Sequence, residues 1–172
     1  MAYILSITAL VVMTIPSVVK GKNMKIILIL LSIGNGLMGT SYLLDGGING
    51  AVSSFIGVVT TAINLCFEVK KLPVPNWLTA IYIAVSVVMN LAVSRGLTVG
   101  VALVIIAGVA YKIGVTRKTG SGYRFWIFFN LFVWCIYDII SGSYGVLVTH
   151  GAQLVVNVAG MVIHDRKSKS VS

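Results

Sequence analysis

Several polar side chains that could bind a solute or a proton lie within the most apolar parts of this chain. His150, Gln153 and Asn157 follow one another at spacings of three and four residues, so a helix would place them on one face. Trp134 and Asp138 have the same four-residue spacing in the preceding apolar stretch. Two such stripes on adjacent helices predict one wall of a polar cavity.

A polar side chain surrounded by hydrocarbon must find a partner or face water. For Asn35 and Asn130 two interpretations stay open: contact with a solute, or an interhelical hydrogen bond worth about 0.6 kcal/mol. Asp138 lies about one turn before the end of its stretch, where it would either reach the membrane interface or, if deeper, bind a solute or a proton. The residues predicted to bind a solute are Asn35, Asn130, Trp134, Asp138, His150, Gln153 and Asn157.

The same chain offers little for covalent or metal chemistry. Its two histidines, His150 and His164, fall at different depths, and no nucleophile–base pair, paired carboxylates or phosphate-binding loop is present. Cys66 and Cys135 lie in separate apolar stretches without metal-ligand spacing, so both are expected to be buried apolar side chains. We therefore expect no enzyme activity, no catalytic residue, no metal and no cofactor.

The elements that carry these residues must be membrane helices. Only 10% of the 172 residues are charged and 58% are hydrophobic, with a mean hydropathy of +1.00, whereas a soluble domain has roughly 25% charged residues. The net charge of +9 comes from short clusters between apolar runs, which argues against nucleic-acid binding. Seven runs have the length of a membrane span: 2–19, 26–44, 48–68, 77–93, 97–115, 125–141 and 144–163.

The fourth and fifth runs are predicted to form a helical hairpin, since Ser94-Arg95-Gly96 interrupts them with a charge and a flexible residue. With seven spans, every basic residue except Arg95 falls on one side of the membrane. The positive-inside rule then predicts an external N-terminus and a cytoplasmic C-terminus. The basic residues follow the first run instead of preceding it, so we expect residues 1–19 to be a span and not a cleaved signal peptide.

The chain also contains an internal repeat. At a shift of 95 residues, Asn35 falls on Asn130, Tyr42 on Tyr137, Gly47 on Gly142 and Gly50 on Gly145. The shift superimposes the first three spans on the last three and leaves the fourth as a linker. The predicted fold class is therefore all-α, with seven transmembrane helices in a 3-1-3 arrangement of two parallel triple-helix bundles. The predicted limits within the single membrane domain 1–172 are 1–71 for the first bundle, 72–96 for the linker helix, 97–166 for the second bundle and 167–172 for a polar tail.

Other residues have structural interpretations. Ser53, Gly57 and Thr61 form a column of small residues that would allow close helix packing. Tyr42 and Tyr137 lie near the predicted outer interface, where an aromatic belt is expected. Pro16 in the first span would remove a backbone hydrogen bond and kink the helix, which makes it a candidate hinge.

Two stretches carry a family resemblance: SIGNGLMGTSYLLDGGINGAVSSFIG and FNLFVWCIYDIISGSYGVLVTHGAQLVVNVAG. They resemble the YgjV-type family of bacterial inner-membrane proteins. The layout is also similar to the PQ-loop and SWEET superfamily and to PnuC-type transporters, which implies triple-helix bundles. In SWEET-type transporters a Trp and usually an Asn line the pocket; Trp134 and His150 stand near those places, whereas the first bundle has Gly39 and Phe55. The proline-glutamine pair is matched only in part, by Pro16-Ser17.

The pattern predicts a transporter or facilitator of a small, neutral polar solute, working by alternating access between the two bundles. The alternative is a structural or regulatory inner-membrane protein whose polar residues hold helices together. The expected partners are the solute and the lipid bilayer, with no nucleic acid, and the protein would be a monomer or a homo-oligomer in the bacterial inner membrane.

Overall fold

The computed structural model describes residues 1–18, 24–94, 96–117 and 120–168. Seven helices are present in this part of the chain, close to the limits that the sequence predicts, and no strand occurs among the described residues. The all-α class and the number of helices are therefore confirmed. The helices are α1 (Ala2–Val18), α2 (Met24–Leu44), α3 (Ile48–Val69), α4 (Asn76–Ser94), α5 (Val99–Val115), α6 (Gly120–Ser141) and α7 (Tyr144–Ser168).

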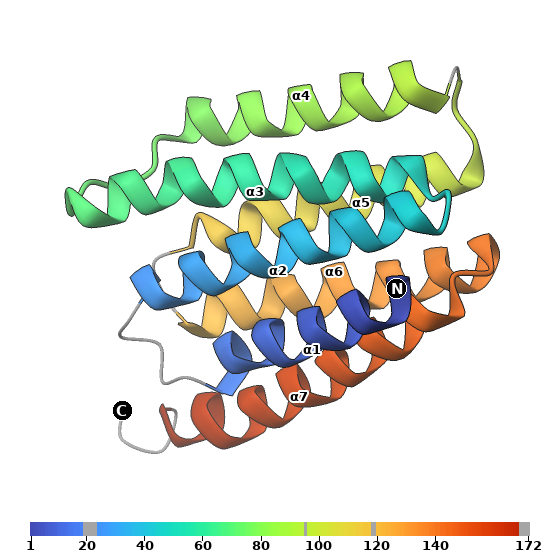
Figure 1. Ribbon diagram of the computed structural model, residues 1–172. Coiled ribbons are helices and arrows are strands. Elements are labelled where there is room, and N and C mark those ends of the chain that lie inside the picture. The colour runs from blue at the N-terminus through green and yellow to red at the C-terminus, as the bar shows by residue number, and fades with distance from the viewer. Residues whose placement is uncertain (19–23, 95, 118–119, 169–172) are drawn as a thin grey trace.

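Five of these helices, α2, α3, α4, α6 and α7, are long and apolar enough to cross a membrane. The remaining two, α1 and α5, are as apolar but have 17 residues each. A helix of that length extends about 25 Å, slightly less than the hydrocarbon core of about 30 Å. Both short helices run beside the longer ones for most of their length (Figure 1).

Six helices form a closed ring, and the seventh lies outside it. In the ring, α1 packs against α2, α2 against α3, α3 against α5, α5 against α6, α6 against α7, and α7 against α1. Helix α4 packs mainly against α3 and α5. Figure 1 shows that the α2–α3, α4–α5 and α6–α7 connections gather at one end of the molecule. The described ends of α1, α3 and α5 lie at the opposite end of the molecule, so successive helices alternate in direction (Figure 1). We call the two ends the α2–α3 end and the α3–α4 end.

The α2–α3 and α6–α7 turns have the same backbone geometry. Gly46 and Gly142 adopt positive φ angles of 77° and 72°, a conformation that glycine enters without steric cost. The amide of Gly47 donates to Tyr42 O at 2.8 Å, and the amide of Ser143 donates to Asp138 O at 2.9 Å. Position 42 thus corresponds to position 138, a spacing of 96 residues and not the predicted 95. The starts of α2 and α6 (Met24, Gly120) and of α3 and α7 (Ile48, Tyr144) have the same spacing.

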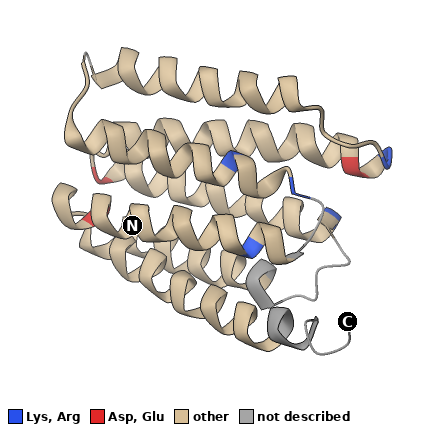
Figure 2. Ribbon diagram, turned by 180° about the vertical axis from the view of Figure 1, so that it is seen from behind, with Lys and Arg blue, Asp and Glu red and all other residues tan. Residues whose placement is uncertain are grey.

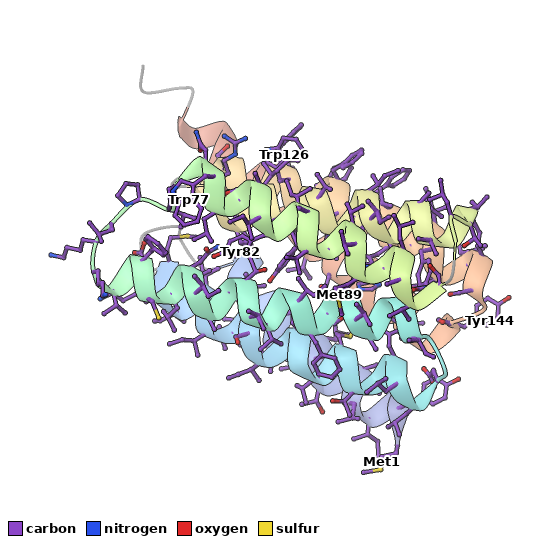
Figure 3. The ribbon with its side chains drawn as sticks, turned by 90° about the horizontal axis from the view of Figure 1, so that it is seen from above. Met1, Trp77, Tyr82, Met89, Trp126 and Tyr144 are labelled. Atoms are coloured by element: carbon purple, nitrogen blue, oxygen red, sulfur yellow. The ribbon has the colours of Figure 1, made fainter. Side chains whose placement is uncertain are left out.

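The outer surface of the helices is apolar, as lipid contact requires. Exposed aromatic residues occur at both ends: Tyr144 at the α2–α3 end and Trp77 at the α3–α4 end (Figure 3). Tyr3 is also exposed, and its ring lies beside Gly145, which follows Tyr144. Lys and Arg residues lie mainly toward the α3–α4 end in Figure 2. Cys66 is exposed and Cys135 is half-buried, so the prediction that both are buried was wrong. An apolar thiol is as stable against lipid as against protein, and the sequence pattern does not separate the two.

Candidate functional site

A cavity of about 40 Å³ lies inside the ring of helices. It has room for about three water molecules. Asn35, Gly108, Asn130 and Gln153, which line it, stand near the middle of α2, α5, α6 and the apolar part of α7. The cavity is therefore central along the helix axes. Five of the seven residues predicted to bind a solute line it: Asn35, Asn130, Trp134, His150 and Gln153.

Asp138 lies behind the cavity wall, with its carboxylate enclosed by two partners. The Tyr42 hydroxyl donates to Asp138 Oδ1 at 2.9 Å, and a 2.6 Å hydrogen bond joins Asp138 Oδ2 to His150 Nδ1. The side chain is fully buried, so it does not reach the membrane interface. Because Tyr42 belongs to α2 and Asp138 to α6, this network connects opposite sides of the ring.

Aromatic rings close the cavity toward the α2–α3 end. The Trp134 indole stacks on the His150 imidazole with ring centroids 5.4 Å apart, and it contacts Tyr42 at 5.7 Å and Tyr137 at 5.4 Å. Tyr42 and Tyr137 are both buried. The prediction that these tyrosines form an interfacial belt was therefore wrong, because both rings turn inward to this cluster.

Apolar packing closes the cavity toward the α3–α4 end. Leu28 and Leu31 of α2 pack there in one cluster with Tyr111 of α5 and with Tyr123 and Ile127 of α6. Beyond this cluster lies a second hollow of about 380 Å³, whose lining includes both acidic and basic side chains: Glu68, Lys71 and Arg117. Packed side chains thus lie between the central cavity and each end of the molecule.

The asparagines satisfy much of their hydrogen-bonding capacity within the protein. Asn35 Nδ2 donates to Leu31 O at 2.7 Å and to the Tyr111 hydroxyl at 2.6 Å. Asn130 Nδ2 donates to the carbonyl of Ala107 at 2.8 Å. Asn157 does not line the cavity, and its Nδ2 donates to the carbonyl of Arg124 at 2.9 Å. Each of these three residues thus joins two different helices, and Asn35 and Asn130 also line the cavity.

Sequence reasoning missed Lys112, which it counted only among the basic residues on one side of the membrane. Lys112 is 1% exposed and lines the cavity. Its ammonium donates to Ser86 Oγ at 3.1 Å and to Gly108 O at 3.3 Å. One signal was present in the sequence: the apolar residues 113–115 still follow the lysine, so it lies within the helix.

The small-residue column of α3 has the predicted packing role. Ser53, Gly57 and Thr61 are buried, and a Cβ atom on Gly57 would lie 3.0 Å from Asn35 Cγ. Gly57 therefore provides the space that the Asn35 amide occupies. Helix α1 continues past Pro16 to Val18, but the Pro16 side chain lies outside the described part of the structure, and its role as a hinge stays a prediction.

Comparison with known protein families supports the family resemblance. The family of bacterial inner membrane proteins called Imp-YgjV matches residues 1–168, nearly the whole chain. This chain belongs to the Imp-YgjV family. Its place is accordingly the bacterial inner membrane, as a multi-pass protein. No curated protein and no solved structure matches the chain.

Proposed function

We propose that this Imp-YgjV protein is a transporter or facilitator of a small polar solute that works by alternating access. The observation that carries the proposal is the central cavity. It is lined by side chains from both halves of the chain: Asn35 and Ser54 from the first, Asn130 and His150 from the second. Solute sites of transporters lie near the bilayer midplane between repeats. A cavity at mid-helix depth with polar side chains in its wall has the position that such a site requires.

The two closures on either side of the cavity would act as gates. Opening the α2–α3 end requires separation of Tyr42 from Asp138, whose hydrogen bond crosses the ring. Opening the α3–α4 end requires separation of Leu28 and Leu31 on α2 from Tyr123 on α6. Since these contacts join different helices, each gate can open by relative movement of the helices without local unfolding. The structure would then correspond to an occluded state.

We further propose seven crossings in a 3-1-3 arrangement, with α1–α3 and α5–α7 as parallel triple-helix bundles and α4 as the linker. The matching turns at Gly46 and Gly142 support this arrangement, as does the position of α4 outside the ring. It would relate the protein to the PQ-loop and SWEET superfamily. The cytoplasm would lie at the α3–α4 end, where Lys70, Lys71 and Arg117 are found, with the N-terminus outside.

A second candidate function is that of a structural or regulatory membrane protein. The hydrogen bonds of Asn35, Asn130 and Asn157 to other helices favour it, because intramembrane asparagines often serve only to hold helices together. In that case the central cavity would never exchange with water, and the gates would not open.

Thiol accessibility in native membranes discriminates between the two functions. Ser54 lines the cavity, whereas Thr60, also buried on α3, does not. Each would be changed to cysteine in a protein that carries Cys66→Ser and Cys135→Ala. For a transporter, a small water-soluble thiol reagent labels Ser54→Cys slowly as the gates open and leaves Thr60→Cys unlabelled. Complete protection of Ser54→Cys at all times and from both sides would exclude transport through this cavity.

A further inference from the structure

Lys112 places a cationic side chain in the wall of the central cavity. A lysine ammonium has three N–H donors and no acceptor, and two neutral oxygens, Ser86 Oγ and Gly108 O, accept from it. No carboxylate of the described residues lies within ion-pairing distance. A buried ammonium without a counter-charge is costly in an apolar environment, so a ligand that supplied the negative charge would be stabilised.

Gln153 provides a second donor at the same cavity. Its side chain is 3% exposed and lines the cavity from α7, while Lys112 belongs to α5. The Gln153 Nε2 atom is buried and has no hydrogen-bond partner. An amide N–H without an acceptor costs about 1–3 kcal/mol, so this group also favours a ligand that accepts hydrogen bonds. Two donors on different helices are thus incompletely satisfied around one cavity.

The carboxylate of Asp138, which lies behind the cavity wall, is not available to a cationic ligand. Both oxygens of Asp138 accept from or pair with protein groups, Tyr42 and His150, and Asp138 is not part of the cavity lining. No aspartate or glutamate of the described residues lines this cavity. The lining therefore combines a cation with neutral polar groups, which is the charge balance that an anion complements.

We propose that the solute carries a single negative charge and that its anionic group, a carboxylate, binds between Lys112 Nζ and Gln153 Nε2. This inference rests on the proposed transport function and replaces the expectation of a neutral solute. A carboxylate has two oxygens and can accept from both donors at once. The volume of about 40 Å³ in the closed state suits a small organic acid of the size of formate or acetate. Lys112 and Gln153 would both bind the solute directly.

The test uses protection of Ser54→Cys, in the background given above, by two pairs of equal-sized compounds: formate with formamide, and acetate with acetamide. Ionic strength is held constant with a chloride salt. Protection by chloride itself is also measured, because chloride is an anion without the two oxygens of a carboxylate. The anions are expected to slow labelling in a saturable way, and the amides are not. In Lys112→Gln the concentration for half-protection should rise roughly tenfold or more, as expected for loss of a hydrogen bond to a charged group. Lys70→Gln, an exposed control, should behave as the parent.

Gln153→Glu provides an independent variant, because it keeps the side-chain shape but replaces the donor with a negative charge. It should abolish protection by the carboxylates even if Lys112→Gln does not fold. Equal protection by acetate and acetamide, or labelling that neither slows, would overturn the anion site while the transport proposal stands. If chloride protected Ser54→Cys at the same concentration as acetate does, the assignment of a carboxylate would be overturned. Absence of any Ser54→Cys labelling would instead refute the transport proposal.

Discussion

Helices α3 and α7 follow equivalent turns but present different side chains to the centre of the molecule. At the 96-residue spacing of the two turns, Ser54 corresponds to His150, Gly57 to Gln153 and Thr61 to Asn157. The α3 face is made of small residues, and the α7 face carries an imidazole and two amides. One helix therefore provides space, and the other provides hydrogen-bonding groups.

Helices α2 and α6 also present different side chains at equivalent positions. Met38 corresponds to Trp134 and Tyr42 to Asp138 at this spacing, and in the second pair the equivalent residues bond to one another. Most of the ionisable and aromatic side chains that line the cavity belong to the second half of the chain: Tyr111, Lys112, Tyr123, Trp134 and His150. An approximate repeat thus keeps its backbone geometry while the side chains of each copy take separate roles, which is how one cavity obtains an asymmetric lining.

The largest expected effect tests Asp138, the carboxylate that stands where the first half of the chain has Tyr42. Asp138→Ala removes the partner of both the Tyr42 hydroxyl and His150 Nδ1. Removing one member of a buried charged network costs about 3–5 kcal/mol, so the unfolding temperature in detergent should fall markedly. Asp45→Ala, at an exposed position next to the α2–α3 turn, should leave it nearly unchanged. Similar unfolding temperatures for the two variants would mean that the Asp138 network does not hold the ring together.

A smaller effect is expected from the glycines in the first turns of α3 and α7. A Cβ atom on Gly50 would lie 2.7 Å from Tyr42 Cδ1, and this ring is held by Asp138 and Trp134. Gly50→Ala should therefore destabilise the protein by about 1–3 kcal/mol through overpacking.

A glycine change in the first turn of α7, one position before the residue equivalent to Gly50, should be tolerated. A Cβ atom on Gly145 would approach Tyr3 Cε1 at 2.5 Å, but Tyr3 is 68% exposed and can rotate away. Thermal unfolding of Gly145→Ala is expected to match the parent within about 0.5 kcal/mol. If Gly145→Ala lowered the stability more than Gly50→Ala, Tyr42 would not be the more firmly held of the two neighbouring rings.

The smallest effect concerns the space that α3 leaves for Asn35. Gly57→Ala would bring a Cβ atom to 3.0 Å from Asn35 Cγ and Oδ1, which disturbs the hydrogen bond to Tyr111 at a cost of about 1 kcal/mol. Gly151→Ala on α7 is the matched control, because nothing lies within 4 Å of its added carbon and alanine favours the helix. Unfolding curves in detergent should show a loss for the first variant and none for the second; equal behaviour would remove the packing role assigned to Gly57.

The positions of the helices were predictable from local sequence features. Apolar runs of membrane length and the breaks at Gly46, Ser94-Arg95-Gly96 and Gly142 give the seven elements nearly as they occur. The cavity-facing stripe of His150 and Gln153 was also predictable, since polar residues at helical spacing in an apolar run must avoid lipid. These signals depend only on residues near one another in the chain.

What the sequence by itself determined about this protein is its membrane class, its helices and one polar stripe, because helix length and spacing are local properties. Only the tertiary structure decided which side chains meet: Tyr42 with Asp138, Asn35 with Tyr111, and Lys112 with the cavity. The physical reason is that lipid tails are as apolar as a protein core. A membrane helix is therefore apolar on its outer face as well as its inner face, and hydrophobic periodicity cannot tell which face turns inward.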